Sequence, residues 1–220
     1  MVTPEVIKLK RSSVKTLVAK AFNFVMTNKE ESTLEYSGMQ KVILAIVEAY
    51  ANIILNRDEV DAPFTVLSLE EKISTELEFE VNGKKEQVKL FGFIDRVDER
   101  NGIVRIVDYK TGSDKLTFSA IEKLFDTDGK SINKALIQTL IYTYAYERQS
   151  GRTGVEPNLF IVKTMADGKV HFNSRKLVLS DGYLEEVKPL FLEELQAKVA
   201  ELFDMNIPFR ASQVPDNYSY

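Results

Sequence analysis

Apolar and polar residues alternate through the middle of the chain, in runs separated by Asn-Gly pairs. Asn82-Gly83 follows the run 77–81 and precedes the run 88–97, and Asn101-Gly102 separates the latter from 103–109. Asn-Gly favours the tight two-residue turn of a β-hairpin because both residues accept a positive φ. The pattern therefore predicts three consecutive antiparallel strands.

Helical periodicity precedes these strands. Residues 38–55 repeat apolar side chains at i, i+3, i+4 and i+7, and Ser37 with Gln40 forms a capping box at their start. We expect this segment to be a helix that packs into the core, with a weaker helix over 12–27. A further apolar run over 64–71 predicts one more strand.

Three helices are expected in the second half of the chain. The segment 132–148, capped by Ser131, is apolar nearly all round, which is typical of a helix that is buried or packs on two sides. The segment 184–203 contains Pro189, which marks either its true start or a bend. A short helix is expected over 118–125.

A last hairpin is expected near the C-terminus. The runs 158–163 and 169–177 are joined by a loop about Asp167-Gly168. The lone histidine, His171, lies between two apolar residues of the second run and is interpreted as an ordinary strand residue. The final dozen residues are expected to be irregular.

Composition describes an ordinary globular chain. The 220 residues fit one domain with a substantial core, and contents of 44% hydrophobic and 28% charged residues do not favour disorder. No apolar run is expected to approach a membrane span, and the N-terminus begins no signal peptide. The absence of cysteine excludes disulfides, thiolate zinc sites and iron–sulfur clusters within this sequence. We therefore expect a cytoplasmic protein that does not bind a membrane.

Net charge argues against nucleic-acid binding by overall charge alone, because the chain carries a net charge of −4. A local basic group could still bind nucleic acid. One such group lies near the N-terminus, and another follows the central strands. The solvated face of a helix is the alternative interpretation of either group. The basic residues are Lys8, Lys10, Arg11, Lys15 and Lys20 in the first group, and Lys123, Lys130 and Lys134 in the second.

Candidate chemistry lies on the second predicted hairpin. Asp95 and Asp108 would face each other across an antiparallel ladder, where opposed side chains approach within roughly 5 Å. Two close carboxylates repel, so they favour a cation, and oxygen ligands suit Mg²⁺ or Mn²⁺. Lys110 projects from the same strand face as Asp108. The set suits metal-assisted phosphodiester hydrolysis, whereas the alternative is the solvated charged face of an ordinary sheet.

The sequence motifs around these residues resemble those of a known family. GFIDRVD from Gly92, followed by IVDYKTG from Ile106, closely resembles the nuclease domain of RecB- and AddB-type helicase-nucleases, within the PD-(D/E)xK superfamily. A further element of that family, Q-x-x-x-Y on the following helix, matches Gln138 to Tyr142. The resemblance covers roughly residues 60–205. It implies an α/β (α+β), restriction-endonuclease-like core, in which helices flank a central mixed sheet.

The resemblance also implies roles for individual residues. Asp95, Asp108 and Lys110 would be catalytic, and the two aspartates would bind the metal. Two further metal ligands are candidates: the backbone carbonyl of Tyr109, and Glu70, for which an exposed strand-end charge is the alternative. Gln138 and Tyr142 would orient the lysine strand or contact the nucleic acid, the alternative being a buried amide beside a packed tyrosine.

The implied organisation is a helical segment over 1–60, a nuclease core over 61–205 and a tail over 206–220, within one domain. The implied function is a Mg²⁺-dependent deoxyribonuclease, an exonuclease by expectation, acting in DNA end processing and recombinational repair within a helicase-nuclease. Its partners would be DNA and a helicase domain or subunit.

The chain also departs from that family. No family histidine is found in residues 1–60, and helicase motifs and the AddB-type cysteine group are missing, which suggests a segment of a larger chain. The alternative function is therefore a nuclease fold that is inactive here and serves as a DNA-binding or scaffolding module. A self-standing defence or adaptation nuclease is a lesser alternative.

Overall fold

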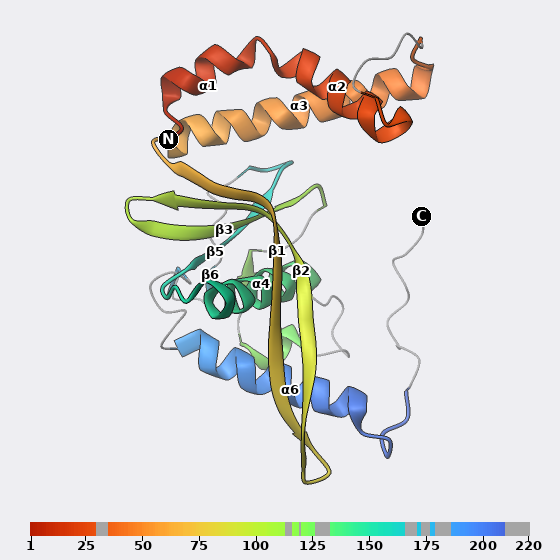
Figure 1. The fold of residues 1–220 in the computed structure, drawn as a ribbon, viewed down its shortest axis with the longest axis vertical. Coiled ribbons are helices and arrows are strands. Elements are labelled where there is room, and N and C mark those ends of the chain that lie inside the picture. Colours follow the sequence, from red (N-terminus) through yellow and green to blue (C-terminus); the bar gives the residue numbers. More distant parts are fainter. Residues whose placement is uncertain are drawn as a thin grey trace.

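The computed structural model describes residues 1–29, 35–112, 116–118, 120–125, 133–165, 171–172, 177–178 and 186–209. A four-stranded mixed sheet in the order β1-β2-β3-β5 forms the centre of the molecule, and helices lie on either side of it (Figure 1). The expected α/β fold with a central mixed sheet is confirmed.

The sheet is built around one long hairpin. β1 (Thr65–Val81) and β2 (Lys84–Arg100) pair antiparallel along their length, and β3 (Ile103–Lys110) pairs antiparallel with the end of β2. Both residues of each Asn-Gly turn have a positive φ, as the sequence predicts. The runs 64–71 and 77–81, expected as separate strands, belong to one continuous strand.

The fourth strand arrives from beyond a helix. β5 (Glu156–Ile161) runs parallel to β3 and pairs with the edge of β3 that faces away from β2. The expected hairpin of 158–163 with 169–177 is wrong, because β6 (His171–Phe172) pairs with β4 (Thr117–Phe118) and β7 (Leu177–Val178) in a second small sheet. Residues 166–170, including the expected turn, lie outside the described part of the chain. The expected strand position of His171 is confirmed.

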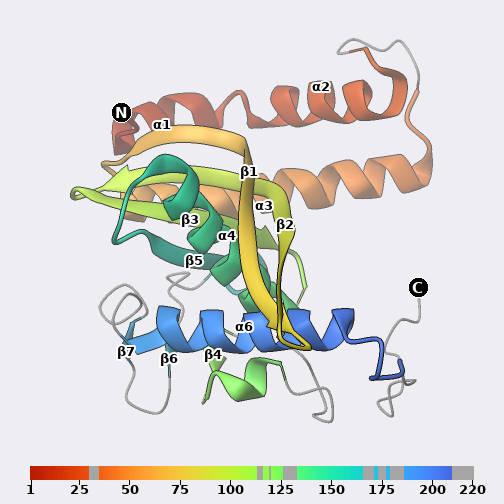
Figure 2. The same ribbon diagram turned by 60° about the horizontal axis from the view of Figure 1, so that its bottom comes forward.

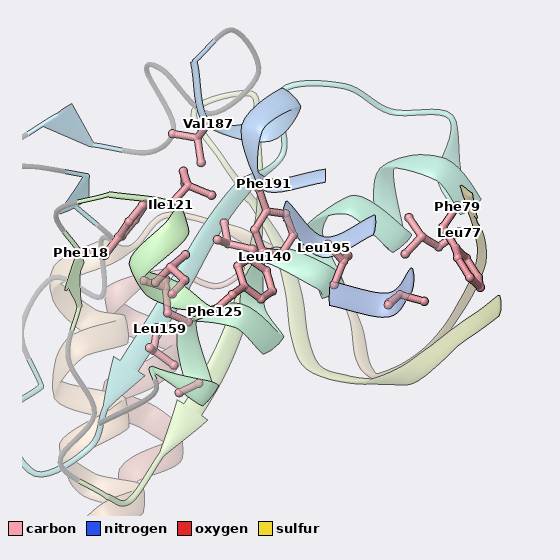
Figure 3. Packing of buried hydrophobic residues seen from close by; sticks show 14 of the residues in the cluster. Leu77, Phe79, Phe118, Ile121, Phe125, Leu140, Leu159, Val187, Phe191 and Leu195 are labelled. Atoms are coloured by element: carbon pink, nitrogen blue, oxygen red, sulfur yellow. The ribbon is translucent and has the colours of Figure 1, made fainter. Parts of the chain in front are cut away.

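Two helices build the main core against one side of the sheet. α4 (Lys134–Ser150) lies between the sheet and α6 (Lys188–Phe203), and the end of the β1–β2 hairpin crosses α6 (Figure 2). Leu140, Leu159 and Phe191 interlock there without solvent exposure (Figure 3). Their burial removes the apolar surface of strand and helices from water together, which is the main source of stability for such a layer.

Three expectations about helices in the second half of the chain are settled by the structure: the cap of α4, the role of Pro189 and the extent of the helix expected over 118–125. The cap of α4 is Asn133, whose side chain accepts a hydrogen bond from the Leu136 amide, whereas the expected cap Ser131 lies outside the described residues. Pro189 stands in the first turn of α6, so it marks the start of this helix and no bend. The expected helix over 118–125 is reduced to a short 3₁₀ turn, η1 (Glu122–Leu124), in its described part.

The N-terminal helices form a layer of their own beyond the sheet (Figure 1). α1 (Pro4–Arg11) and α2 (Val14–Thr27) both pack against α3 (Gly38–Asp61), and the capping box of Ser37 and Gln40 is present. The expectation that the helix from 38 packs into the core is wrong. Its apolar residues Met39, Val42, Ile43, Ile46 and Val47 are exposed in the described structure.

α3 is long and apolar enough to cross a membrane, judged by its length and composition only. Core helices of soluble proteins and signal sequences pass the same test, so this is weak evidence. The sequence expectation that no apolar run approaches the length of a membrane span is therefore not met by α3.

A buried charge network joins α3 to the sheet. Asp98 is fully buried and pairs with Arg105 at 2.6 Å and with Arg96 at 3.0 Å. Arg96 in turn pairs with Asp58 at 2.9 Å, and Arg105 with Asp61 at 3.3 Å, both at the end of α3. Buried charges are tolerated only when they are paired in this way, so the network holds the helix end on β2 and β3.

Candidate active site

A chain of hydrogen bonds connects the end of β3 with the first turns of α4. The Lys110 Nζ donates to Asp108 Oδ1 at 3.1 Å and to Gln138 Oε1 at 3.0 Å. The Gln138 Nε2 then donates to the hydroxyl of Tyr142 at 2.7 Å. The structure therefore brings together the two halves of the predicted site, which lie 28 residues apart in the sequence.

Asp108 and Lys110 share one face of β3 because strand side chains alternate. The Asp108 side chain is almost entirely removed from solvent, whereas Lys110 is only partly buried. Their ion pair has an Nζ–Oδ2 distance of 2.9 Å. A partly buried ammonium held between a carboxylate and an amide oxygen has a fixed direction, so it can donate a hydrogen bond to a bound group.

The side chain of Asp95, on β2, is hydrogen-bonded to the backbone of β3. The antiparallel ladder of β2 with β3 ends at the pair Arg96–Val107, and the next position in that register sets Asp95 opposite Asp108. At this point β3 pairs with β5 on its other side, with Asp108 beside Leu159. The Asp95 Oδ2 accepts a hydrogen bond of 2.7 Å from the Tyr109 amide. Asp95 thus lies at the open end of the ladder, next to the D-x-K segment of Asp108, Tyr109 and Lys110.

Glu70 does not join these groups. Its neighbours Leu69 and Glu71 pair with Arg96 and Ile94, so Glu70 lies opposite Asp95 in the register, but its φ is +50° and it is exposed. Among the described residues, no group of three or more His, Cys, Asp or Glu side chains is arranged to hold a metal ion. The candidate carboxylate ligands that the structure brings together at β3 are therefore Asp95 and Asp108.

The side chain of Tyr109 is held on the side of β3 away from this chemistry. Its ring stacks on Phe160 at a centroid distance of 5.8 Å, and the Arg96 guanidinium lies 5.5 Å from its centre. Burial raises the pKa of the Tyr109 phenol, although the nearby Arg96 opposes this, so the phenol remains neutral at physiological pH. These contacts leave the backbone carbonyl of Tyr109 as its only candidate ligand atom.

A glycine of the motif accommodates the last member of the hydrogen-bond chain. A Cβ atom built on Gly92 would stand 2.6 Å from Cε1 and 2.8 Å from the hydroxyl oxygen of Tyr142. Only a residue without a side chain lets the ring lie this close to β2. Sequence reasoning gave Gly92 no role, since the motif alone does not show what approaches it.

A cavity of about 450 Å³ opens beside the hydrogen-bond chain, between β2 and α4. Gln138 and Tyr142 form part of its wall. The remaining lining residues are Lys89, Leu90, Phe91, Lys134, Ile137 and Ile141. Among these six, only Lys134 had a possible role in binding from the sequence, as part of a basic group, because a sequence does not show which strand and helix faces leave a cavity between them.

The donor atoms of this site fit a hard divalent cation. Asp95, Asp108 and the Tyr109 carbonyl offer oxygen only, and oxygen ligands are those that Mg²⁺ and Mn²⁺ prefer. Mg²⁺ keeps several waters and is commonly held by one or two carboxylates together with substrate phosphates, so a third carboxylate is not required.

Comparison with known proteins agrees with these features. A search of curated proteins found no match. The family model of the PD-(D/E)XK nuclease superfamily matches residues 6–214, which include the sheet, α4, α6 and every residue of the candidate site. Members of this superfamily are generally metal-dependent phosphodiesterases. The chain therefore belongs to the PD-(D/E)XK nuclease superfamily.

Proposed function

We propose that the protein is a Mg²⁺- or Mn²⁺-dependent deoxyribonuclease of the RecB/AddB type, with Asp95, Asp108 and Lys110 as its catalytic residues. The observation that carries the proposal is the position of the Lys110 ammonium, 3.0 Å from Gln138 Oε1 and 2.9 Å from Asp108 Oδ2. The motif, its geometry and the family membership support the same chemistry.

Each residue has a distinct task in this proposal. Asp95 and Asp108 hold the cation, with the Tyr109 carbonyl as a further ligand. When bound, the cation would lower the pKa of a water molecule and offset negative charge on the scissile phosphate. Lys110 donates a hydrogen bond to the attacking water or to a phosphate oxygen, and Gln138 with Tyr142 keeps its ammonium aimed at that position.

The order of the residues along β3 explains why this lysine can act. Asp108 compensates the positive charge of Lys110, and Gln138 accepts a second hydrogen bond from it. An ammonium with defined partners is already oriented before the substrate arrives, so little reorganisation is needed in the transition state.

The RecB/AddB resemblance adds exonuclease action, DNA end processing, recombinational repair and a helicase partner to this proposal. A cytoplasmic location is proposed from the absence of cysteine. A second candidate function is a DNA-binding or scaffolding module without cleavage. One observation favours it: no third His, Cys, Asp or Glu ligand joins Asp95 and Asp108 among the described residues.

The decisive experiment follows linear DNA labelled at either its 5′ or its 3′ end, with Mg²⁺, Mn²⁺ or EDTA. We expect cleavage that requires the cation, that is lost in Lys110→Ala and Asp108→Asn, and that persists in Lys41→Ala, which removes an exposed lysine of α3. Release of mononucleotides from one labelled end would support exonuclease action. Equal cleavage by all four proteins would contradict the proposed site, and no cleavage with intact DNA binding would support the scaffolding function.

A further inference from the structure

One edge of the long β1–β2 hairpin has no partner strand in the described part of the chain. β2 pairs with β1 along its length, whereas β3 covers its other edge only from Arg96 to Arg100. The hairpin continues well beyond β3 toward α6 (Figure 1). Among the described residues, no hydrogen bond from another element reaches the backbone of residues 84–93 on that side. We call this part of β2 the open edge.

Hydrogen bonds on the opposite edge of the hairpin show which backbone groups point outward. On β1, the Ser74 amide donates to Gln149 Oε1 and the Lys72 carbonyl accepts from Gln149 Nε2, so both residues turn their backbone away from β2. Two residues that face each other in an antiparallel ladder are either bonded to one another or both turned outward. The register partners of Ser74 and Lys72, which are Phe91 and Phe93, therefore direct their N–H and C=O groups to the open edge.

Side chains protect the outer edge of β1. Gln149 bonds two backbone positions there as a neighbouring strand would, and Gln196 Nε2 donates to the Glu78 carbonyl at 2.7 Å. Unpaired strand edges are templates for further strands, which is why proteins usually cover them. No side chain of the described residues bonds the open edge of β2 in this way. That edge therefore remains able to accept a strand.

The cavity of about 450 Å³ runs along the open edge. Three consecutive residues of β2, Lys89 to Phe91, form one wall, and no residue of β1 lines it. Because consecutive side chains of a strand point to opposite faces, a wall that includes all three exposes the backbone edge of the strand. Leu90 lies on the face toward α4 and packs, like Ile137 and Ile141, against the main core, whereas Lys89 and Phe91 lie on the other face. The space thus lies next to the outward backbone groups.

A strand added at the open edge would meet apolar side chains on both of its faces. Its side chains toward α4 would enter the cavity against Leu90, Ile137 and Ile141. Those on the other face would lie beside Phe91 and Phe93, which are 73% and 53% exposed. Aromatic residues pair favourably with aromatic and β-branched residues on a neighbouring strand. The open edge therefore suits a segment rich in β-branched and aromatic residues.

The charge of the open edge indicates an acidic partner. Three lysines and one glutamate lie within residues 84–93, a net charge of +2 in a chain whose net charge is −4. Two copies of this edge would repel each other, whereas an acidic strand would be attracted. Nucleic acid would also be attracted, but the outward C=O groups are acceptors and find no donor on a phosphate. The charged residues are Lys84, Lys85, Glu86 and Lys89, and all four are exposed.

We propose that the open edge of β2 is a docking site for an extended, acidic segment of a partner protein, which adds to the sheet as a strand beside Lys89 to Phe93. Backbone hydrogen bonds supply the affinity, and the cavity together with the two exposed phenylalanine rings selects the side chains. The bound strand lies against Gln138 and Tyr142, which line the same cavity, so the partner contacts the hydrogen-bond chain of the candidate active site. This docking does not depend on whether the protein cleaves DNA.

The probe is a displayed library of random linear peptides of about ten residues, the length of a long strand. The library is selected on the full chain, and the tightest peptides are synthesised with a fluorescein label. We expect them to be rich in β-branched, aromatic and acidic residues, and to protect the amides of Lys89 and Phe91 from hydrogen exchange, measured by nuclear magnetic resonance. The amides of Val88 and Leu90 bond to β1 and should be protected in the free protein already.

Proline at position 89 tests the backbone donor directly. It removes one outward N–H and no hydrogen bond to β1, and edge strands tolerate proline in such a position. Lys89→Pro should weaken peptide binding about tenfold relative to Lys89→Ala, because a carbonyl of the peptide is left without its donor. Glu76 is the register partner of Lys89 and belongs to the other edge of the hairpin, so Glu76→Pro is the matched control and should leave binding unchanged.

The outcomes distinguish the possible occupants of the edge. The proposal is overturned if no selected peptide protects these two amides, or if Lys89→Pro and Lys89→Ala bind peptide equally. A wild-type dimer that Lys89→Pro converts to a monomer would instead assign the edge to a second copy of the chain. Protection of the same amides by a single-stranded oligonucleotide in EDTA, and by no peptide, would assign it to nucleic acid. Far-ultraviolet circular dichroism shows whether each variant folds, and amide protection in the wild type tests the proposal without any variant.

Discussion

The ring of Tyr142 lies so close over Gly92 that a Cβ atom at position 92 would stand 2.6 Å from its Cε1 carbon. This contact links the first half of the motif, on β2, with the hydrogen-bond chain of α4 that reaches Lys110. The space at Gly92 therefore sets the position of Tyr142, and through Gln138 it bears on Lys110, the lysine that we propose to be catalytic.

Gly92→Ala should be destabilising and should reduce cleavage. The added methyl group must displace the Tyr142 ring, and overpacking of this kind costs about 1–3 kcal/mol in the free energy of unfolding. Urea unfolding and the cleavage assay measure the two effects. Gly38→Ala is the control, because a Cβ there meets no atom within 4 Å. If Gly92→Ala combined with Tyr142→Ala were no more stable than Gly92→Ala alone, the proposed clash would be wrong.

Gln138→Ala should slow cleavage while the fold stays intact. Lys110 would lose its amide acceptor and adopt more orientations, and loss of such supporting contacts typically costs roughly 10–100-fold in activity. Tyr142→Phe removes only the hydroxyl that accepts from Gln138, so its effect should be smaller. Gln149→Ala is a matched control on the same helix, since its amide bonds the backbone of β1. Equal rates for Gln138→Ala and Gln149→Ala would argue against the positioning role.

Asp98→Ala should be among the most destabilising single substitutions in this protein. It would leave the buried Arg96 and Arg105 without their shared carboxylate, and breaking a buried pair from one side costs roughly 3–5 kcal/mol. Its sequence neighbour Glu99 is 40% exposed and pairs with Arg152 at 3.5 Å, so Glu99→Ala should cost less than about 1 kcal/mol. Chemical denaturation of both variants measures the difference, and similar midpoints would contradict the structural role of the network.

Stability should depend on pH through Asp58. Burial raises the pKa of this carboxyl above its unfolded value, although Arg96 opposes the shift, so the folded state binds the proton more tightly. The resulting stabilisation is complete at low pH and is lost as the pH rises through the raised pKa. The free energy of unfolding of the wild type should therefore fall relative to that of Asp58→Asn as the pH rises above about 4, the unfolded pKa of an aspartate. A difference between the two proteins that grew with pH would contradict this sign.

Where the sequence and the structure agree, the reason is local. The capping box at Ser37 and the two Asn-Gly turns require only neighbouring residues, since the hydrogen bonds and positive φ values involve positions next to one another. The second turn also sets the register of β2 with β3, which aligns Asp95 with Asp108. The site could be predicted to this extent because a hairpin carries its own geometry.

Where they differ, distant contacts decide. The apolar pattern of α3 indicated a core helix, but the core is filled by α4 and α6, and α3 is joined to the sheet through the charges of Asp58 and Asp61. The strand expected to pair with 169–177 pairs with β3, because the parallel arrangement buries it beneath α4. A periodic pattern shows that a face is apolar, but it does not show which element will cover it.

By itself, the sequence determined the capped start of α3, the two Asn-Gly hairpins and the register that sets Asp95 opposite Asp108, because capping, strand alternation and turn geometry act over a few residues. Only the tertiary structure decided that Gln138 bonds Lys110, that Gly92 makes room for Tyr142, and that a cavity opens beside them between β2 and α4. These relationships depend on how α4 packs against the sheet, and that packing is set by the burial of the whole core.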